Sequence, residues 1–430
     1  MLASSCIRRS AGSALRSRSY STAVSSELGF QSAVVDGVQI AAKDVSSPVT
    51  TLSFVIKAGS RYSTTPGVAH ALQRFAFQNT KNRSGFRLTR ETELHGGALT
   101  STITRDSIIL TARFLKEDLP FFFEALSDVV STPQLARHEL AEIVGPLLKL
   151  DYLDAAKDVS YVASETLHGI AFRSGLGLPL LSQPIDSINS KIIAEYKEDV
   201  YTKANLAIVA SGASVSQLSE LAAKFLDETE AGTTVPVPTS AVHGGESRIA
   251  STDGNAISLG FPTASDPEFS VLAAILGGAP SIKWASSNSI LGATTGGNAV
   301  AKLNKYAGAN LLSINVTGSS AAEVSSSAAS AVNALKSVAS GVETDALKKA
   351  VAAAKFDYLA SFAEPGFLGV IGTEILTSGA VPSVAKAVSE LEAVSAANVK
   401  AAAAKLLAGK KATVAIGKVT ELAYADELGL

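Results

Sequence analysis

The residues of this chain that come closest to a catalytic pattern are His70, Gln73 and Arg74. Zinc peptidases of the H-x-x-E-H type carry a Glu and a second His at the two later positions. On a helix, the two His share one zinc ion and the Glu acts as a general base. The amide of Gln73 cannot take a proton from water, and Arg74 puts a permanent positive charge in the place of a metal ligand. We therefore expect the spacing of a zinc centre with no catalytic residue and no bound metal.

The surroundings of His70 resemble a known family. Residues 67–70 read GVAH ahead of a helical run, and residues 91–106 further on read ETELHGGALTSTITRD. This arrangement resembles the processing-peptidase (pitrilysin-like) family, whose pattern is G-x-A-H-x-x-E-H followed by E-x-x-G-G-x-x-N-A-x-T-x-R-E. The resemblance implies a further zinc ligand, a Glu, in a later helix, where this chain offers Asp151 and Asp154 instead. The catalytic residues of the family therefore do not carry over.

The remaining candidate residues are interpreted as scaffold or surface. Asp151 and Asp154 lie three positions apart on a predicted helix and could pair as carboxylates, but a solvated helical face is the favoured interpretation. The glycine pairs at 277–278 and 296–297 are not followed by G-K-[ST], which excludes a phosphate-binding loop. His168 lies in a segment that resembles a structural part of the same family. The other histidines show no ligand spacing: His95, His138 and His243.

Length and composition indicate a large folded chain without a nucleic-acid partner. The 430 residues suffice for two or more domains, and 47% hydrophobic against 18% charged residues supports a sizeable core. A net charge of -2 provides no basic surface for nucleic acid. Cys6 is the single cysteine, so the rest of the chain has no disulfide and no Cys-ligated metal. No run of about eighteen strongly apolar residues occurs, so we expect no membrane span.

The first twenty residues have the composition of a mitochondrial transit peptide. Arginines alternate there with Ser and Ala, and no acidic residue occurs before Glu27. An Arg-rich, Ser-rich and acid-poor segment is typical of such peptides; the alternative is a disordered basic tail. Residues 18–21 (RSYS) resemble a matrix processing site. We therefore expect removal of residues 1–20 and a mature chain in the mitochondrion that begins near Ser21.

Strand-like and helix-like segments alternate along the chain and predict an α+β fold. Residues 50–56 are typical of a strand, and residues 190–202 are typical of a helix. Gly and Pro are dense in residues 228–246, which predicts an extended linker. We expect one domain at 33–227, an inactive peptidase-like domain, and a second peptidase-like domain at 247–430.

The second half of the chain repeats the first. Equal offsets in separate segments indicate an internal repeat. We expect two homologous domains, each a mainly antiparallel sheet covered on one face by helices. The family resemblance implies the same paired architecture. Helices are predicted to start at Thr132-Pro133 and, correspondingly, at Thr344-Asp345. The matching segments, all at an offset of 206 residues, are 188–193 with 394–399 and 208–210 with 414–416.

The segment 276–288 separates two branches of the family. It lacks the long glycine-rich loop of the regulatory subunit of the processing peptidase, and it resembles a segment of core subunits of respiratory complex III, the ubiquinol–cytochrome c reductase. This resemblance implies a structural subunit without haem or quinone, on the matrix side of the inner membrane. It implies a related core subunit as partner and a dimeric complex. A non-catalytic, presequence-binding subunit of the processing peptidase is the alternative, and an independent peptidase ranks third.

Overall fold

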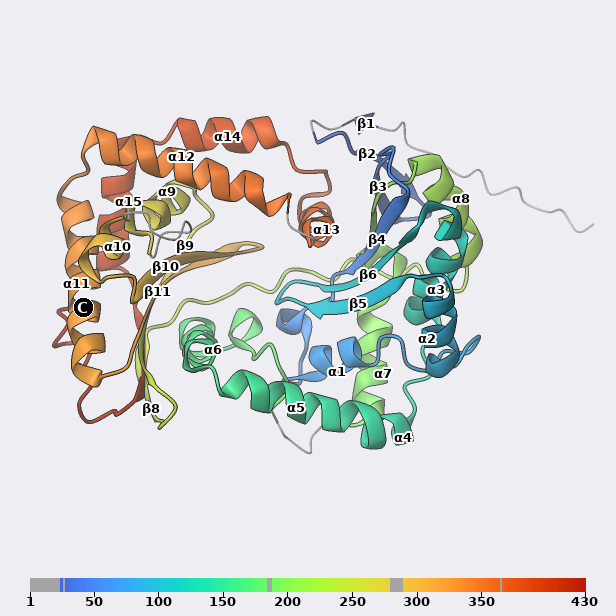
Figure 1. The fold of residues 1–430 in the computed structure, drawn as a ribbon, viewed down its shortest axis with the longest axis horizontal. Helices are drawn as coiled ribbons and strands as arrows, with labels where there is room; N and C mark the ends of the chain where they lie inside the picture. The colour runs from blue at the N-terminus through green and yellow to red at the C-terminus, as the bar shows by residue number, and fades with distance from the viewer. Residues whose placement is uncertain (1–23, 26–27, 184–187, 279–288, 364–365) are drawn as a thin grey trace, which may run out of the picture.

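Two α+β units lie side by side, the N-terminal one coloured blue to green and the C-terminal one yellow to red (Figure 1). The predicted fold class, two homologous α+β domains joined by an extended linker, is confirmed. The predicted transit peptide, residues 1–20, and most of the segment 276–288 lie outside the described residues. The computed structural model describes residues 24–25, 28–183, 188–278, 289–363 and 366–430.

The N-terminal sheet contains seven strands of the described chain. They are β1 (Val24–Ser25), β2 (Gln31–Val35), β3 (Val38–Lys43), β4 (Val49–Ile56), β5 (Ala98–Ile103), β6 (Ile108–Leu115) and β7 (Leu206–Ser211). Their order is β1-β2-β3-β7-β4-β6-β5. β3 and β7 run parallel, and the other neighbouring pairs are antiparallel. The interior strand β4 reads VTTLSFVI, rich in the β-branched and aromatic residues that suit a buried strand.

The C-terminal sheet repeats this order with five strands of the described chain. They are β8 (Gly245–Ala250), β9 (Asn255–Thr263), β10 (Ala299–Tyr306), β11 (Ala309–Gly318) and β12 (Ala412–Gly417). The order β8-β12-β9-β11-β10 corresponds strand for strand to β3-β7-β4-β6-β5, and β8 and β12 are again parallel. β7 and β12 begin at Leu206 and Ala412, which is the offset of the sequence repeat. β1 and β2 have no counterpart among the described strands, so β8 lies at the edge of its sheet.

One face of each sheet is covered mainly by helices of the same half. Among the described helices, none is long and apolar enough to cross a lipid bilayer. The N-terminal half contributes α1 (Val68–Arg74), α2 (Gly85–Leu94), α3 (Leu119–Ser131), α4 (Arg137–Glu139), α5 (Gly145–Ala156), α6 (Val159–Phe172), α7 (Ser190–Val200) and α8 (Val215–Phe225). The C-terminal half contributes α9 (Pro267–Leu276), α10 (Ile290–Thr294), α11 (Ala321–Ser340), α12 (Thr344–Ser361), α13 (Phe367–Ser378), α14 (Val384–Glu392) and α15 (Ala396–Ala408).

Each half also gives one helix to the opposite face of the other sheet. From the N-terminal half, α6 buries Leu167 in a core with Leu311 and Val414 of the C-terminal sheet. From the C-terminal half, α13 buries Ile371 in a core with Val209 of the N-terminal sheet. The exchange is visible where α6 lies beside the C-terminal strands and α13 beside β4 (Figure 1). The prediction of helices on one face was therefore incomplete, because a helix from the other half covers the second face.

The segment between α8 and β8 has no helix or strand of its own and is hydrogen-bonded to both halves. The N–H of Val235 donates to Asn205 Oδ1 at 2.8 Å, and Nζ of Lys410 donates to the Val242 carbonyl at 2.8 Å. These bonds fix one end of the extended segment to the N-terminal half and the other end to the C-terminal half. The exact boundaries 33–227, 228–246 and 247–430 stay a prediction.

The helix predicted to start at Thr132-Pro133 begins later, at Arg137. Pro133 forms an isolated β-bridge with Thr80, and the carbonyl of Thr132 accepts the N–H of Lys81 at 3.0 Å. A residue before proline is also biased toward extended backbone. The prediction was wrong because hydrogen bonds to the segment around Thr80 hold the backbone on both sides of Pro133 in extended structure.

Candidate functional site

Helix α1 carries the motif residues and is buried over most of its length. Residues 68–73 are all buried, and Arg74 at the C-terminal end is partly exposed. The helix begins after Gly67, whose φ of 84° lies in the left-handed region that favours glycine. A Cβ at this position would lie 2.6 Å from Ser182 Oγ. Glycine therefore lets α1 start directly against the segment that contains Ser182.

His70 makes two hydrogen bonds that fix its tautomer. Nδ1 accepts the backbone N–H of Ser182 at 3.1 Å, so the proton of the neutral ring lies on Nε2 and is donated to Asp151 Oδ2 at 3.1 Å. The pKa of His70 is lowered to about 4, chiefly by burial and then by the charge of Arg74, while Asp151 acts in the opposite direction. The imidazole is therefore neutral at the pH of the cell.

Arg74 binds the carboxylate of Asp151 with two donors. Its Nε donates to Oδ2 at 2.6 Å, and one Nη donates to Oδ1 at 2.5 Å. Asp151 belongs to α5, so this fork joins α1 to α5. Bidentate pairs of this kind are stronger and more specific in geometry than single hydrogen bonds. The guanidinium thus supplies the positive charge that holds these residues together.

Gln73 connects α1 to β5. Its side-chain amide donates to the Ser101 carbonyl at 2.9 Å and to Ser101 Oγ at 2.6 Å. Both amide protons are directed at one residue of β5. A glutamate at this position would place acceptor oxygens against the Ser101 carbonyl. The amide therefore has a structural role here that a general base would not fill without local rearrangement.

These residues do not fit a zinc ion. A histidine ligand must present a lone pair to the metal, but His70 Nδ1 accepts from Ser182 and Nε2 carries a proton. Both carboxylate oxygens of Asp151 are bound by Arg74. Across the residues that the structure describes, no group of three or more His, Cys, Asp or Glu side chains could hold a metal ion.

Asp151 is a residue that the sequence interpretation named but placed in the wrong surroundings. A solvated helical face was expected, and the structure instead places this side chain, 19% exposed, between His70 and Arg74. The expectation was wrong for Asp151, whereas Asp154 does lie on the exposed face beside Lys157. In the sequence, Arg74 was the residue that could have indicated a partly buried position for Asp151. A guanidinium on a buried helix requires a counter-charge, and Asp151 stands where the family resemblance implies the further zinc ligand.

The other histidines lie outside this site. His168 donates from Nδ1 to the Ser164 carbonyl at 2.7 Å, and its Nε2 accepts the hydroxyl of Tyr306 at 2.8 Å. Burial is the main cause that lowers the pKa of His168 to about 3. This neutral ring joins α6 to β10 across the two halves, which agrees with a scaffold role. His95 forms a contact of 2.8 Å with Asp118.

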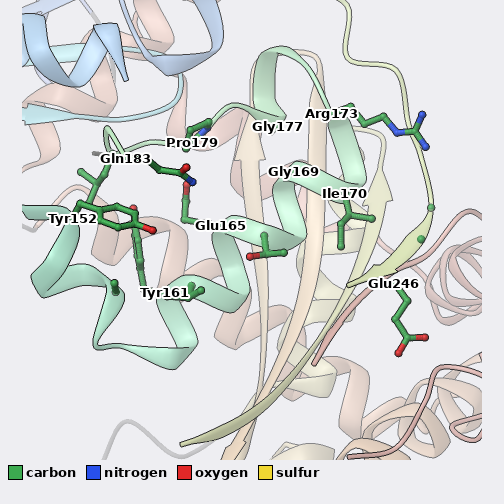
Figure 2. Close-up of a pocket in the computed structure, with 16 residues that line it drawn as sticks. Tyr152, Tyr161, Glu165, Gly169, Ile170, Arg173, Gly177, Pro179, Gln183 and Glu246 are labelled. Carbon is green, nitrogen blue, oxygen red and sulfur yellow. The ribbon is translucent and has the colours of Figure 1, made fainter. Parts of the chain in front are cut away.

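Two hollows lie away from the motif residues. The larger, of about 1680 Å³, lies between the halves and is lined by Arg105 from one side and by Lys302 and Tyr306 from the other. The smaller, of about 520 Å³, lies between α5, α6, the chain near Pro179 and the start of β8 (Figure 2). Neither is lined by His70, Gln73 or Arg74, so neither contains the degenerate motif.

Two family models match this chain. Residues 39–183 match the insulinase (peptidase family M16) model, and residues 187–354 match the model of the peptidase M16 inactive domain. Together they cover more than half of the 430 residues. The chain belongs to the M16 peptidase family, which confirms the resemblance seen around His70.

The chain is similar along most of its length to subunits of a respiratory complex. It is 39% identical to the cytochrome b-c1 complex subunit 2, mitochondrial, of Neurospora crassa, over 99% of this chain and 96% of that protein. The protein of the same name from Yarrowia lipolytica is 37% identical over 93% and 96% of the two chains. The one from Rattus norvegicus is 30% identical over 91% and 90%.

Proposed function

We propose that this chain is a structural subunit of the mitochondrial cytochrome b-c1 complex, the ubiquinol–cytochrome c reductase, of the kind called subunit 2 or core protein 2. Its role is the assembly and stability of the complex in respiratory electron transport. The observation that carries the proposal is the similarity over nearly the whole chain to subunits 2 of that complex from fungi and from mammals.

The chain is proposed to be non-catalytic. Support comes from the site itself, where a guanidinium occupies the place of a metal ligand and Gln73 occupies the place of the general base. The hydrogen bonds of His70, Gln73 and Arg74 join α1 to α5 and β5. The residues of a former metal site would then stabilise the N-terminal domain. No metal, haem or quinone belongs to this chain in the proposal.

The proposed partners are core protein 1, a relative of this chain, and the other subunits of the complex, which is dimeric. The chain would lie on the matrix side of the mitochondrial inner membrane as a peripheral subunit, delivered by residues 1–20. Support comes from the word mitochondrial in the names of the relatives and from the Arg-rich start of the chain. The domain division is proposed as 33–227 and 247–430, with the linker between them.

Depletion of the chain tests this function. Cells without it are expected to lose stable cytochrome b and its haem absorbance, and ubiquinol-dependent reduction of cytochrome c should fall with them. In native electrophoresis of wild-type mitochondria, the chain should migrate with the haem-bearing complex. Normal reductase activity in depleted cells, together with a failure to remove presequences from imported proteins, would replace this function with that of a processing-peptidase subunit.

A further inference from the structure

The outer edge of β8 is an unpaired sheet edge. The N–H of Gly245 donates to Lys411 and that of Ser251 donates to Gly417, so alternate residues of β8 face β12. The backbone N–H and C=O groups of Glu246, Arg248 and Ala250 therefore point away from the sheet. No hydrogen bond to these groups comes from any residue that the structure describes. Such an edge is a template for another strand.

The internal repeat shows what this position holds in the other half. β3 corresponds to β8, and its outer edge is paired antiparallel with β2 over residues 31–35. Both sheets otherwise have the same strand order. The C-terminal sheet thus lacks, within the described chain, the antiparallel strand that completes its counterpart.

A cavity with mainly apolar walls opens beside the same edge. The hollow of about 520 Å³ reaches the first residues of β8, Gly245 and Glu246, and its walls include Tyr152, Tyr161 and Ile170 (Figure 2). Ile170 on α6 faces the strand, since a Cβ on Gly245 would lie 3.4 Å from its Cγ2. In a sheet, alternate side chains of an added strand would point to this face. The cavity is therefore placed to accept one of them.

The rim of the cavity carries a free positive charge. Arg173, the residue that follows α6, lines the cavity and is exposed to solvent. Within the described residues, its guanidinium has no ion pair and no hydrogen bond. The nearby carboxylates are already engaged, Glu165 by Arg105 and Glu246 by Arg248. An acidic side chain of a partner would complement Arg173.

We propose that an extended segment of another subunit adds to the edge of β8 as an antiparallel strand, with a large apolar side chain in the cavity beside Ile170 and an acidic side chain at Arg173. Main-chain hydrogen bonds would provide affinity, and the cavity and the guanidinium would provide specificity. The segment belongs to a partner protein, a claim that deepens the proposed function by naming a contact surface of the chain within its complex.

Residue-resolved hydrogen exchange in the purified native assembly tests this strand. The outward amides of Glu246, Arg248 and Ala250 are expected to exchange at least about tenfold more slowly than in an unstructured chain. Ile170→Glu should return these amides to fast exchange, because it puts a charge in the cavity. The inward amides of Ser247 and Ile249 should stay slow in both proteins, which shows that the sheet is intact.

A matched control and a cross-link complete the test. Leu94→Glu, at an exposed apolar residue of α2, should leave the exchange at β8 unchanged. A benzophenone attached to Ala250→Cys should cross-link to one stretch of a different subunit; within this chain, Cys6 is the only other cysteine. Fast outward amides in the intact assembly overturn the proposal, and so does a cross-link to a second copy or to residues 1–23 of this chain. If the assembly is not the cytochrome b-c1 complex, the proposed function fails, while the exchange result still decides the strand.

Discussion

Leu167 on α6 packs so closely on Gly260 of β9 that a Cβ on Gly260 would lie 2.9 Å from Leu167 Cδ1. Leu167 is fully buried; its Cγ would also lie at 2.9 Å and its other methyl carbon, Cδ2, at 3.0 Å. Gly260 therefore lets a helix of the N-terminal half lie directly on the C-terminal sheet. The contact joins the two halves through packing and needs no hydrogen bond.

Gly260→Ala is expected to destabilise the chain by about 1 to 3 kcal/mol, because the added methyl overpacks this contact. Thermal or denaturant unfolding of the purified protein measures the change. Gly366→Ala is the matched control, since a Cβ there meets nothing within 4 Å, and it should change the stability by less than about 0.5 kcal/mol. Equal unfolding midpoints for the two variants would contradict the close approach of α6.

Loss of Arg74 is expected to destabilise the N-terminal domain. Arg74→Met removes the two guanidinium donors from the partly buried carboxylate of Asp151 and leaves it only the N–H of His70 Nε2, at a cost of about 1 to 3 kcal/mol. The double variant Arg74→Met with Asp151→Leu should be more stable than the sum of the single changes predicts, by about 0.5 kcal/mol or more. A double-mutant cycle in denaturant measures this coupling. Strictly additive effects would show that the pair contributes no joint stability.

The neutral state of His70 predicts a pH dependence of stability. The folded-state pKa is lowered to about 4, so the unfolded chain binds more protons between about pH 6.5 and pH 4. The contribution of His70 is complete above about pH 6.5 and is lost as the pH falls through this window. His70→Asn should reduce the slope of the unfolding free energy by up to about 1.4 kcal/mol per pH unit.

The control for this pH effect is His138→Asn, at an exposed histidine, which should leave the slope unchanged. Some slope should remain in His70→Asn, because the pKa of buried His168 is also lowered. Identical pH profiles for wild type and His70→Asn would refute the assignment of a neutral, buried His70.

The purified chain is expected to bind no stoichiometric zinc and to cleave no peptide. Gln73→Glu with Arg74→His restores the two motif letters, yet it should not restore full activity. Asp151 is shorter than the Glu that the family resemblance implies, and Ser182 donates to His70 Nδ1, which favours the tautomer with a proton on Nε2. Metal analysis after zinc exposure and dialysis measures binding, with an active zinc peptidase as positive control. One tightly bound zinc ion per wild-type chain would contradict the prediction.

The mature protein is expected to begin near Ser21. N-terminal sequencing of the protein isolated from mitochondria measures this directly. An Arg16→Ala, Arg18→Ala variant should show reduced import or altered cleavage, because the basic residues define the segment. An intact Met1 on the mitochondrial protein would remove the argument for a transit peptide.

Much of the fold follows from local pattern, as α7 illustrates. The helix predicted at 190–202 is observed at Ser190–Val200, where Asn189 caps it by accepting the N–H of Ile192 at 3.0 Å. The equal offsets of the repeat also correctly matched β7 of the first sheet with β12 as its counterpart in the second. Periodicity and caps are local signals, and these elements depend on little else.

Other features depend on contacts that no local pattern reports. Helices α6 and α13 look like ordinary apolar helices in the sequence, and only the tertiary structure shows that each packs on the sheet of the other half. Asp151 was misplaced for a similar reason: its partner Arg74 lies 77 residues away. The replacement of the family's Glu and second His by Gln73 and Arg74 is, in contrast, visible in the sequence itself, and the prediction of no zinc chemistry rests on these two side-chain types.

The exchange of α6 and α13 has a consequence for the order in which the chain can mature. All strands of the N-terminal sheet are present once residue 211 has been made, yet the apolar face with Val55 and Val209 stays bare until α13, which ends at Ser378, is available. A chain truncated before that helix would leave this apolar face exposed to solvent and would be prone to aggregation. Folding to completion must therefore wait for almost the entire polypeptide, so a truncated chain is expected to be bound by chaperones or degraded by proteases.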